Sequence, residues 1–382
     1  MPIGPRIVRL FGTKNLSKLV QDHGLKINDI SETLKDYHDT ETWKKKWFGE
    51  DGLFHGDPKG LAFNLSTDGM CPWKDKKYSM WPISLQLLNY PPSLRKKINS
   101  LFLSGVVPGS SVKKGCEAKS LEPYLGILVD EILELSDVEL HDSYTDLPFN
   151  LKAKLVHYIL DFPGISKVLN LPAQGAIKAC PWCDVTGYYC KCAGKTIYLE
   201  NRRFLPADSP LRFDKVNFPF GQTEEKHYPT KPDNTEMNSL RTRYDQLPND
   251  AQKKKFSKMH GVKGNYQLNR MESHGGKDDI SGDFMHTLKN FLQRVLNIIS
   301  GKNVSKIAAA DKEARSHEEI DEEVRRWLLS REEKDLVQSR CKKVMFSQNH
   351  TGDKGNIIDE NVLSKTQSWQ EVNFILISLE SK

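Results

Sequence analysis

Alternating apolar and polar residues mark three short segments in the first third of the chain. The stretch LAFNLSTD places apolar side chains between smaller or polar ones, which is typical of a half-buried strand. Two further apolar segments follow, and a Pro-Pro or a Pro-Gly pair ends each of them. The three predicted strands are residues 61–68, 80–89 and 99–107.

The spacing of apolar residues then changes to that of a helix. Over residues 121–136 they recur at intervals of three and four, which predicts an amphipathic helix. The next segment, residues 151–164, has an apolar and partly β-branched centre and ends at Pro163-Gly164. Its lysine-rich start could be helical and its end a strand, so this pattern leaves both interpretations open.

The order of these elements predicts the topology of a sheet. Short connections make the first three strands antiparallel, and the helix supplies the crossover that a parallel fourth strand needs. Strand, strand, strand, helix, strand is the opening order of a ribonuclease-H-like core in the α/β class. In that core, acids at the ends of the first and fourth strands are neighbours, and here they are Asp68 and Asp161.

Four regions are predicted along the chain. Residues 1–58 form a polar, partly helical lead-in, and residues 59–170 form the first part of the core. Residues 171–280 are rich in loops, cysteines and basic side chains, and residues 281–382 form a helical C-terminal part. The clearest helical pattern covers residues 283–300. Because the chain stops on an apolar segment, we expect it to be truncated.

Charge and hydropathy narrow the class of protein only slightly. A net charge of +6 over 382 residues mildly favours a polyanionic partner, but it also suits an ordinary soluble enzyme. No apolar run is long enough to span a bilayer, and the first residues lack the apolar core of a signal peptide. We therefore expect a nuclear or cytoplasmic protein that is neither secreted nor bound to a membrane.

Four of the seven cysteines lie close together in CPWCDVTGYYCKC: Cys180, Cys183, Cys190 and Cys192. In a reducing compartment such a cluster favours a metal site over disulfides, and a CxxC pair suits tetrahedral, structural zinc. The second pair is CxC, which is less usual, so a later histidine could replace one ligand. The cysteines could also be free thiols. The candidate histidines are His227, His260 and His274.

The two strand-end acids have a catalytic and a structural interpretation. Carboxylates brought together on a rigid sheet can hold magnesium, and two such ions can assist phosphoryl transfer. A third carboxylate normally completes such a site. However, Asp-Gly is a common turn pair, and an aspartate before Phe-Pro commonly ends a strand. Spacing by itself favours the structural interpretation for Asp68 and Asp161.

Five blocks of sequence occur in the order that one family shares. They are FNLSTDGMCPWKDKKYSMWPISLQLLNYPPSLR, LFLSGVVPGS, LVHYILDFPGISKVLNLPAQGAIKACPWC, YLENRRFLPADSPLR, and HGVKG with GDFMHTLKNFLQRVL. Together they resemble the CACTA-type (En/Spm) DNA transposases, and the last block resembles the animal branch of that family. The resemblance covers about residues 60–300.

The resemblance implies a ribonuclease-H-like nuclease with an inserted zinc-binding element and a magnesium- or manganese-dependent carboxylate site. Asp68 and Asp161 match the first two acids of that site. Some family members have a glutamate two positions after the histidine of the Asp-x-Met-His block, whereas this chain has Leu288. Asp283 is the candidate third acid, and Glu371 is the alternative.

The missing glutamate leaves two functions open. The chain is expected either to cleave and transfer DNA strands, or to be a degenerate, catalytically inactive derivative that binds DNA or chromatin. An unrelated zinc-containing scaffold would require five ordered blocks to be a coincidence. DNA is the expected partner, with a homo-oligomer on the DNA. Basic side chains that could contact phosphates, although a solvated surface is their default explanation, are Arg202, Arg203, Lys253, Lys254, Lys255 and Lys263.

Overall fold

The computed structural model divides the chain into two compact units, which are described separately. The first comprises Met1–Val185 and Pro229–Gly282, and the second comprises Thr186–Tyr228 and Asp283–Lys382. The structure describes residues 1–24, 36–72, 79–109, 118, 120–173, 175–190, 195–198, 200–214, 216, 228–230, 233–271, 279–282, 330–332, 335 and 339. The predicted helix at 283–300 lies outside these residues. The four-region division of the chain stays a prediction.

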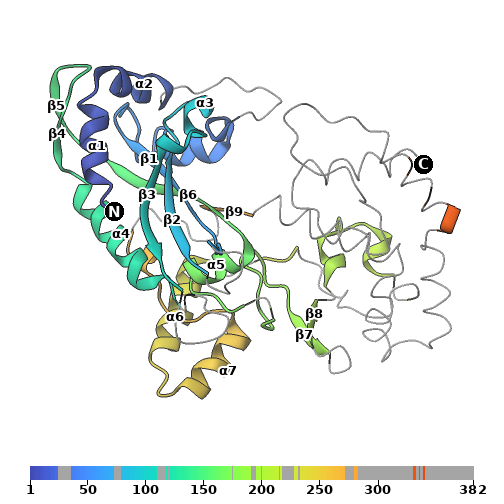
Figure 1. Ribbon diagram of the computed structural model, residues 1–382. Helices are drawn as coiled ribbons and strands as arrows, with labels where there is room; N and C mark the ends of the chain where they lie inside the picture. The colour runs from blue at the N-terminus through green and yellow to red at the C-terminus, as the bar shows by residue number, and fades with distance from the viewer. Residues whose placement is uncertain are drawn as a thin grey trace. The chain divides into compact units, whose positions relative to one another are not determined.

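A five-stranded mixed sheet forms the centre of the first unit (Figure 1). Its strands are β1 (Leu61–Thr67), β2 (Trp81–Leu87), β3 (Leu101–Val107), β6 (Ala153–Leu160) and β9 (Ile280–Gly282). Their order across the sheet is β3-β2-β1-β6-β9. The first three strands are antiparallel, whereas β6 is parallel to β1 and β9 is parallel to β6. The α/β class, the three antiparallel strands and the parallel fourth strand are confirmed.

The connection from β3 to β6 contains the predicted helix and an unpredicted hairpin. The helix is α4 (Glu122–Leu135), and the hairpin consists of β4 (Glu139–Asp142) and β5 (Leu147–Asn150). The lysine-rich segment after the hairpin is a strand from Ala153 onward, so its helical interpretation is wrong. The reason is tertiary: this segment pairs with β1 along its length. It ends in α5 (Phe162–Val168).

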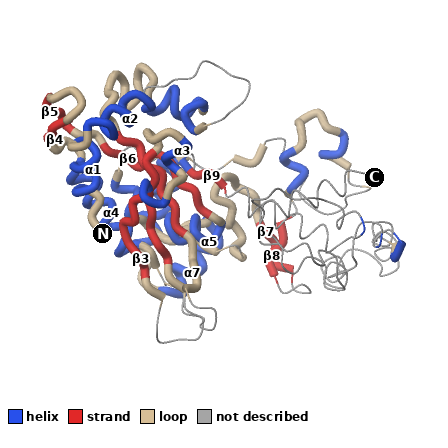
Figure 2. The backbone as a smooth tube through the Cα atoms, turned by 45° about the horizontal axis from the view of Figure 1, so that its top comes forward, coloured by secondary structure: helices blue, strands red, loops and turns tan. Residues whose placement is uncertain are grey.

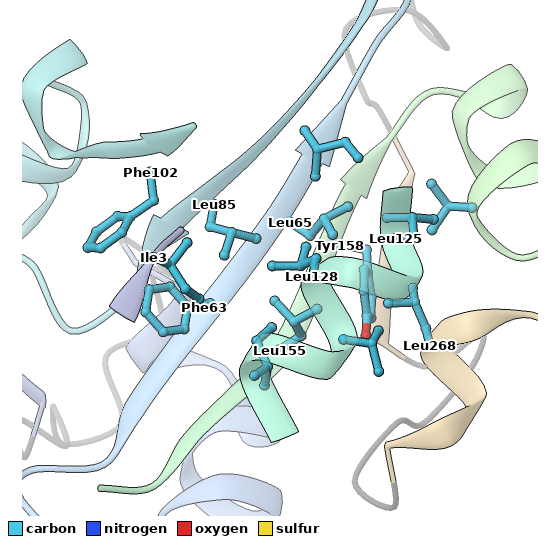
Figure 3. Packing of buried hydrophobic residues seen from close by; sticks show 14 of the residues in the cluster. Ile3, Phe63, Leu65, Leu85, Phe102, Leu125, Leu128, Leu155, Tyr158 and Leu268 are labelled. Carbon is cyan, nitrogen blue, oxygen red and sulfur yellow. The ribbon is translucent and has the colours of Figure 1, made fainter. Parts of the chain in front are cut away.

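One face of the sheet carries the main hydrophobic core. Phe63 and Leu65 of β1 are fully buried on this face, as is Tyr158 of β6. Figure 3 shows Leu125 and Leu128 of α4 lying against these side chains. The alternation along β1 therefore directs every second residue toward α4, as the period of a strand requires.

The N-terminal residues complete this core. Helix α1 (Gly4–Phe11) buries Ile7, Leu10 and Phe11, and the preceding Ile3 lies beside Phe63 in Figure 3. The sequence pattern indicated only a polar, partly helical lead-in. The helix is too short for its apolar spacing to stand out, and the contact with the sheet supplies most of its stability.

A smaller aromatic cluster covers the opposite face. Trp43 and Trp47, from the single turn η2 (Thr42–Trp47), are fully buried against Ala62 of β1 and Val156 of β6. The sheet is therefore covered on both faces, as is usual for a sheet with central parallel strands. Figure 2 shows helices on both sides of the red strands.

Further helices and strands complete the two units. In the first unit they are α2 (Lys14–Gly24), α3 (Pro92–Arg95), α6 (Asn234–Asp245), α7 (Asp250–His260), η1 (Tyr37–Asp39), η3 (Ile98–Ser100) and η6 (Gln267–Arg270). In the second unit they are β7 (Gly187–Cys190), β8 (Lys195–Tyr198), η4 (Asn201–Phe204) and η5 (Pro210–Arg212). Within the described parts of the chain, no helix is long and apolar enough to cross a bilayer.

The buried carboxylate of Asp142 joins α2 to the β4–β5 hairpin. It accepts hydrogen bonds from Ser17 Oγ, from Gln21 Nε2 at 3.0 Å and from Thr145 Oγ1 at 2.6 Å. Lys59 Nζ lies 3.2 Å away. Burial would raise the pKa of the Asp142 carboxyl, but these hydrogen bonds, with that of Ser17 the largest, hold it well below its usual value.

Asp142→Asn should lower the free energy of unfolding at pH 7 by about 2–4 kcal/mol, because it breaks a buried, hydrogen-bonded charge pair. Because the pKa of this carboxyl is lower in the folded than in the unfolded state, its ionised form stabilises the protein at pH values above the unfolded-state pKa of about 3.9. The stabilisation is lost as the pH falls below that value. The difference between the variant and the wild type should therefore narrow below about pH 4. Urea unfolding at several pH values measures it. The exposed Asp146→Asn in the same hairpin is the control, and equal losses in both variants would contradict the assignment.

Candidate functional site

The two predicted acids lie at the carboxyl ends of adjacent parallel strands. Asp68 directly follows β1, and Asp161 directly follows β6. Ser66 pairs with Ile159, so the same register continued by two residues sets Asp68 opposite Asp161. Neighbouring strands lie about 4.8 Å apart, so the backbones at the two acids are neighbours.

A β-bulge determines that alignment. Phe63 pairs with Leu155, but Asn64 pairs with His157, so Val156 is an extra residue on β6. A bulge of this kind shifts the register of everything that follows it. If the register of Phe63 and Leu155 continued without a bulge, Asp68 would stand opposite Leu160 rather than Asp161.

The contacts of Gly164 support this proximity. A Cβ atom built on Gly164 would lie 2.9 Å from Asp161 Oδ1 and 3.4 Å from the carbonyl oxygen of Thr67. The Asp161 carboxylate and the end of β1 therefore meet around the same glycine. A larger residue at this position would press against both.

Asp161 also has a structural role as the N-cap of α5. Its Oδ1 accepts a hydrogen bond of 2.6 Å from the backbone N–H of Gly164. Such caps satisfy a donor that the first helical turn leaves without an intrahelical partner. The carboxylate is half-buried, and the cap fixes its orientation at the sheet edge.

Asp68 does not begin a turn. The antiparallel pairing of Thr67 with Ile83 continues in the same register to a bridge between Met70 and Met80. Asp68 therefore lies in extended chain, opposite Pro82, which has no N–H to donate to the ladder. This explains why the regular strand ends at the acid. The side chain of Asp68 is exposed. Because the pairing continues past Asp68 and Gly69, the turn interpretation of Asp-Gly is wrong.

The third strand end on this side belongs to β9. Gly282, its last residue, pairs with Leu160, the residue before Asp161. Two side-chain contacts hold this short strand: the ion pair between Lys46 and the buried Asp279, and a 2.6 Å hydrogen bond between His157 Nε2 and Ser281 Oγ. The candidate third acids Asp283 and Glu371 lie outside the described residues, although Asp283 follows Gly282 in sequence.

The first two cysteines of the cluster lie side by side. The Sγ atoms of Cys180 and Cys183 are 3.1 Å apart, and their hydrogen bond, followed by burial, raises the pKa of the Cys183 thiol. Two sulfurs on one tetrahedral zinc would lie about 3.8 Å apart, given Zn–S bonds of about 2.3 Å. The two sulfurs would have to move apart by about 0.7 Å to occupy two corners of a zinc site.

Among the other predicted zinc ligands, His260 alone has a side chain that the structure describes. The backbone of Cys190 ends β7 in the second unit, and Cys192, His227 and His274 lie outside the described residues. His260 ends α7, and the segment before Cys180 packs beside it: a Cβ on Gly261 would lie 2.8 Å from the carbonyl oxygen of Lys178.

The predicted DNA-contacting residues divide into buried and exposed sets. Arg202 donates to the carbonyl oxygen of Asp214, and Arg203 forms an ion pair with Glu200 at 2.5 Å; both arginines are buried. The sequence did not indicate that these two arginines are internal, because charge itself does not distinguish a buried arginine from one on the surface. Lys254, Lys255 and Lys263 are exposed, and Lys253 is half-buried. Lys253, Lys254 and Lys255 belong to α7.

These features define a mixed α/β protein whose parallel strands end in acidic residues at one edge of the sheet. A family model described as "Transposase family tnp2" matches residues 31–242. The match spans more than half of the 382 residues, so the chain belongs to this transposase family. Membership implies DNA as the class of partner. A search of curated proteins finds no significant match.

The cap can be separated from the charge of Asp161 by two substitutions. Asp161→Ala should lower the free energy of unfolding by about 1 kcal/mol, because it removes the cap. Asp161→Asn should change it by only a few tenths of a kcal/mol, because asparagine caps helices as well as aspartate does. Thermal or urea unfolding of both variants provides the measurement. A similar loss in the two variants would show that the cap is not the stabilising contact.

Proposed function

We propose that this protein is a CACTA-type (En/Spm) transposase of the animal branch that cleaves and transfers DNA strands at a divalent-metal carboxylate site. The observation that carries the proposal is the register of β1 and β6, which sets Asp68 opposite Asp161 at the carboxyl edge of the sheet. The strand order and directions of the sheet support a ribonuclease-H-like core, with β6 and β9 as its fourth and fifth strands.

Asp283 is the third acid in this proposal. The pairing of Gly282 with Leu160 supports it, because the residue that follows each member of this pair is an aspartate. Asp283 is the next residue in sequence after β9, whereas Glu371 is far in sequence from every described strand.

The carboxylates fit magnesium or manganese, which prefer hard oxygen ligands. When bound, such ions would activate the attacking hydroxyl and stabilise the leaving oxygen in phosphoryl transfer. The contribution of the protein is to hold the acids in place. The cap fixes Asp161, and the pairing on both sides of Asp68 fixes its backbone.

A structural zinc site and a DNA-binding surface belong to the same proposal. Cys180 and Cys183 would supply two zinc ligands, with Cys190 and Cys192, or a histidine, completing the site. Lys254 and Lys255 of α7, together with Lys263, would contact the phosphate backbone, since these three are the exposed members of the predicted basic set. A nuclear location and a homo-oligomer on DNA follow from the resemblance.

A second function is a catalytically inactive derivative that binds DNA or chromatin. One observation favours it: the cap that Asp161 provides to α5 gives this residue a structural role that does not depend on catalysis. Asp161 could therefore be retained in a protein that has lost its activity.

Nicking of a DNA duplex that carries the element's terminal sequence tests the first function. The wild type should nick in the presence of magnesium or manganese and not in the presence of a chelator. Asp68→Asn, Asp161→Asn and Asp283→Asn should each lower the rate by at least about 100-fold, because each removes a metal-binding charge. Glu371→Gln should leave it unchanged.

The outcomes separate the candidates. Nicking that survives in Asp68→Asn or Asp161→Asn would overturn the carboxylate site. Loss of nicking in Glu371→Gln, without loss of nicking in Asp283→Asn, would identify Glu371 rather than Asp283 as the third acid. Metal-independent DNA binding by a wild type that never nicks would establish the inactive derivative. Because Asp161→Asn preserves the cap, loss of activity in this variant cannot be attributed to misfolding of α5.

The α7 surface can be tested through the salt dependence of DNA binding. The double variant Lys254→Gln/Lys255→Gln should bind DNA more weakly for all sequences, and its log–log salt slope should fall by about 2, since each phosphate contact contributes about 0.9. Fluorescence anisotropy at several salt concentrations measures the slope. Lys96→Gln/Lys97→Gln removes the same charge from exposed lysines near α3 and should leave the slope unchanged. Equal effects in both pairs would indicate a response to net charge.

A further inference from the structure

We propose that His23, Asp36 and His38 form a binding site for zinc that is separate from both the acidic sheet edge and the cysteines. Their potential ligand atoms, two imidazole nitrogens and a carboxylate oxygen, all lie within 4.8 Å of one another. In the part of the chain that the structure describes, this is the only group of three or more such residues that is gathered so closely.

The three residues come from two segments of the first unit. His23 lies in the last turn of α2, Asp36 is the N-cap of η1, and His38 lies within η1. The rings of His23 and His38 are 4.5 Å apart between centroids. Their proximity therefore depends on the tertiary structure, and a bound ion would join α2 directly to η1.

His38 is held in the form that a metal ligand needs. Its Nε2 lies 2.9 Å from the carbonyl oxygen of Leu88, which can only accept, so Nε2 carries the proton and Nδ1 has the lone pair. Metal-binding histidines commonly donate their second N–H to such a carbonyl. The ring is buried and stacks on Trp43, with centroids 4.0 Å apart and planes inclined by 16°.

Arg95 organises the carboxylate in the manner of an outer-shell partner. Its guanidinium binds both oxygens of Asp36, at 2.5 and 3.1 Å, and also donates to the Leu88 carbonyl that His38 uses. Ligating carboxylates are commonly hydrogen-bonded in this way.

The donor set selects the ion. Two imidazoles and one carboxylate suit zinc, and with three protein ligands a water molecule would take the fourth position. Ligand atoms around tetrahedral zinc lie roughly 3.3 Å apart, given bonds of about 2.0–2.1 Å. Closing the observed group to that size requires shifts on the order of 1 Å, which the half-exposed His23 at the end of α2 can supply.

The site lies far from the acidic edge of the sheet. Leu88 pairs with Ala62, near the start of β1, whereas Asp68 follows the end of that strand. At about 3.3 Å per residue, the two ends of β1 are about 20 Å apart. Zinc at this position would therefore act as a structural link between α2, η1 and the end of β2, and it would not take part in phosphoryl transfer.

Zinc titration of the full chain in a Cys180→Ser/Cys183→Ser background tests the proposal, because this background removes the paired thiols. Calorimetry should still detect zinc binding in this background. His23→Gln in the same background should weaken zinc binding by at least about 100-fold, because substitutions of outer-shell partners already lower metal affinity by up to about 100-fold. His141→Gln, which alters an exposed histidine of β4, should leave it unchanged.

Two results would overturn the site. One is the absence of zinc binding in the cysteine background, which does not depend on whether any histidine variant folds. The other is unchanged binding in folded His23→Gln, with folding checked by circular dichroism. A second readout is the melting temperature, measured with every variant in the cysteine background: zinc should raise it in that background itself and after His141→Gln, but not after His23→Gln.

Discussion

The parallel pairing of β1 with β6 is the interaction on which the rest of the first unit depends. Parallel neighbours cannot be joined by a tight turn, so the chain must leave the sheet and return through a crossover. Here α4 fills that crossover and covers one face, while the aromatic turn η2 covers the other. The pairing also brings together two acids from distant parts of the sequence, because both strands end at the same edge.

The candidate site uses contacts that also stabilise the fold. Asp161 caps α5, Gly164 leaves room for its carboxylate, and the bulge at Val156 aligns it with Asp68. The same bulge places Val156 and His157 toward the aromatic face, where His157 contacts the ring of Tyr37 and reaches Ser281 of β9. One extra residue thus affects both the alignment of the acids and the attachment of the fifth strand.

The two ends of the sheet differ in their chemistry. Asp68 and Asp161 follow the carboxyl ends of adjacent parallel strands, and hard cations prefer the oxygen donors that carboxylates offer. The opposite end combines imidazole nitrogens of His23 and His38 with the Asp36–Arg95 ion pair, a donor set that suits zinc. The distance between them allows a structural ion at one end without interference at the other.

Much of the first unit could be predicted from the sequence, because its signals are local. Alternation over 61–68 and helical spacing over 121–136 reflect which faces are buried, and the strand-end positions of Asp68 and Asp161 follow from those patterns. The tertiary structure decided what depends on distant partners. It showed that α1 completes the core and that one bulge aligns the acids. Such features have no local pattern, because burial and register are set by residues far away in the chain.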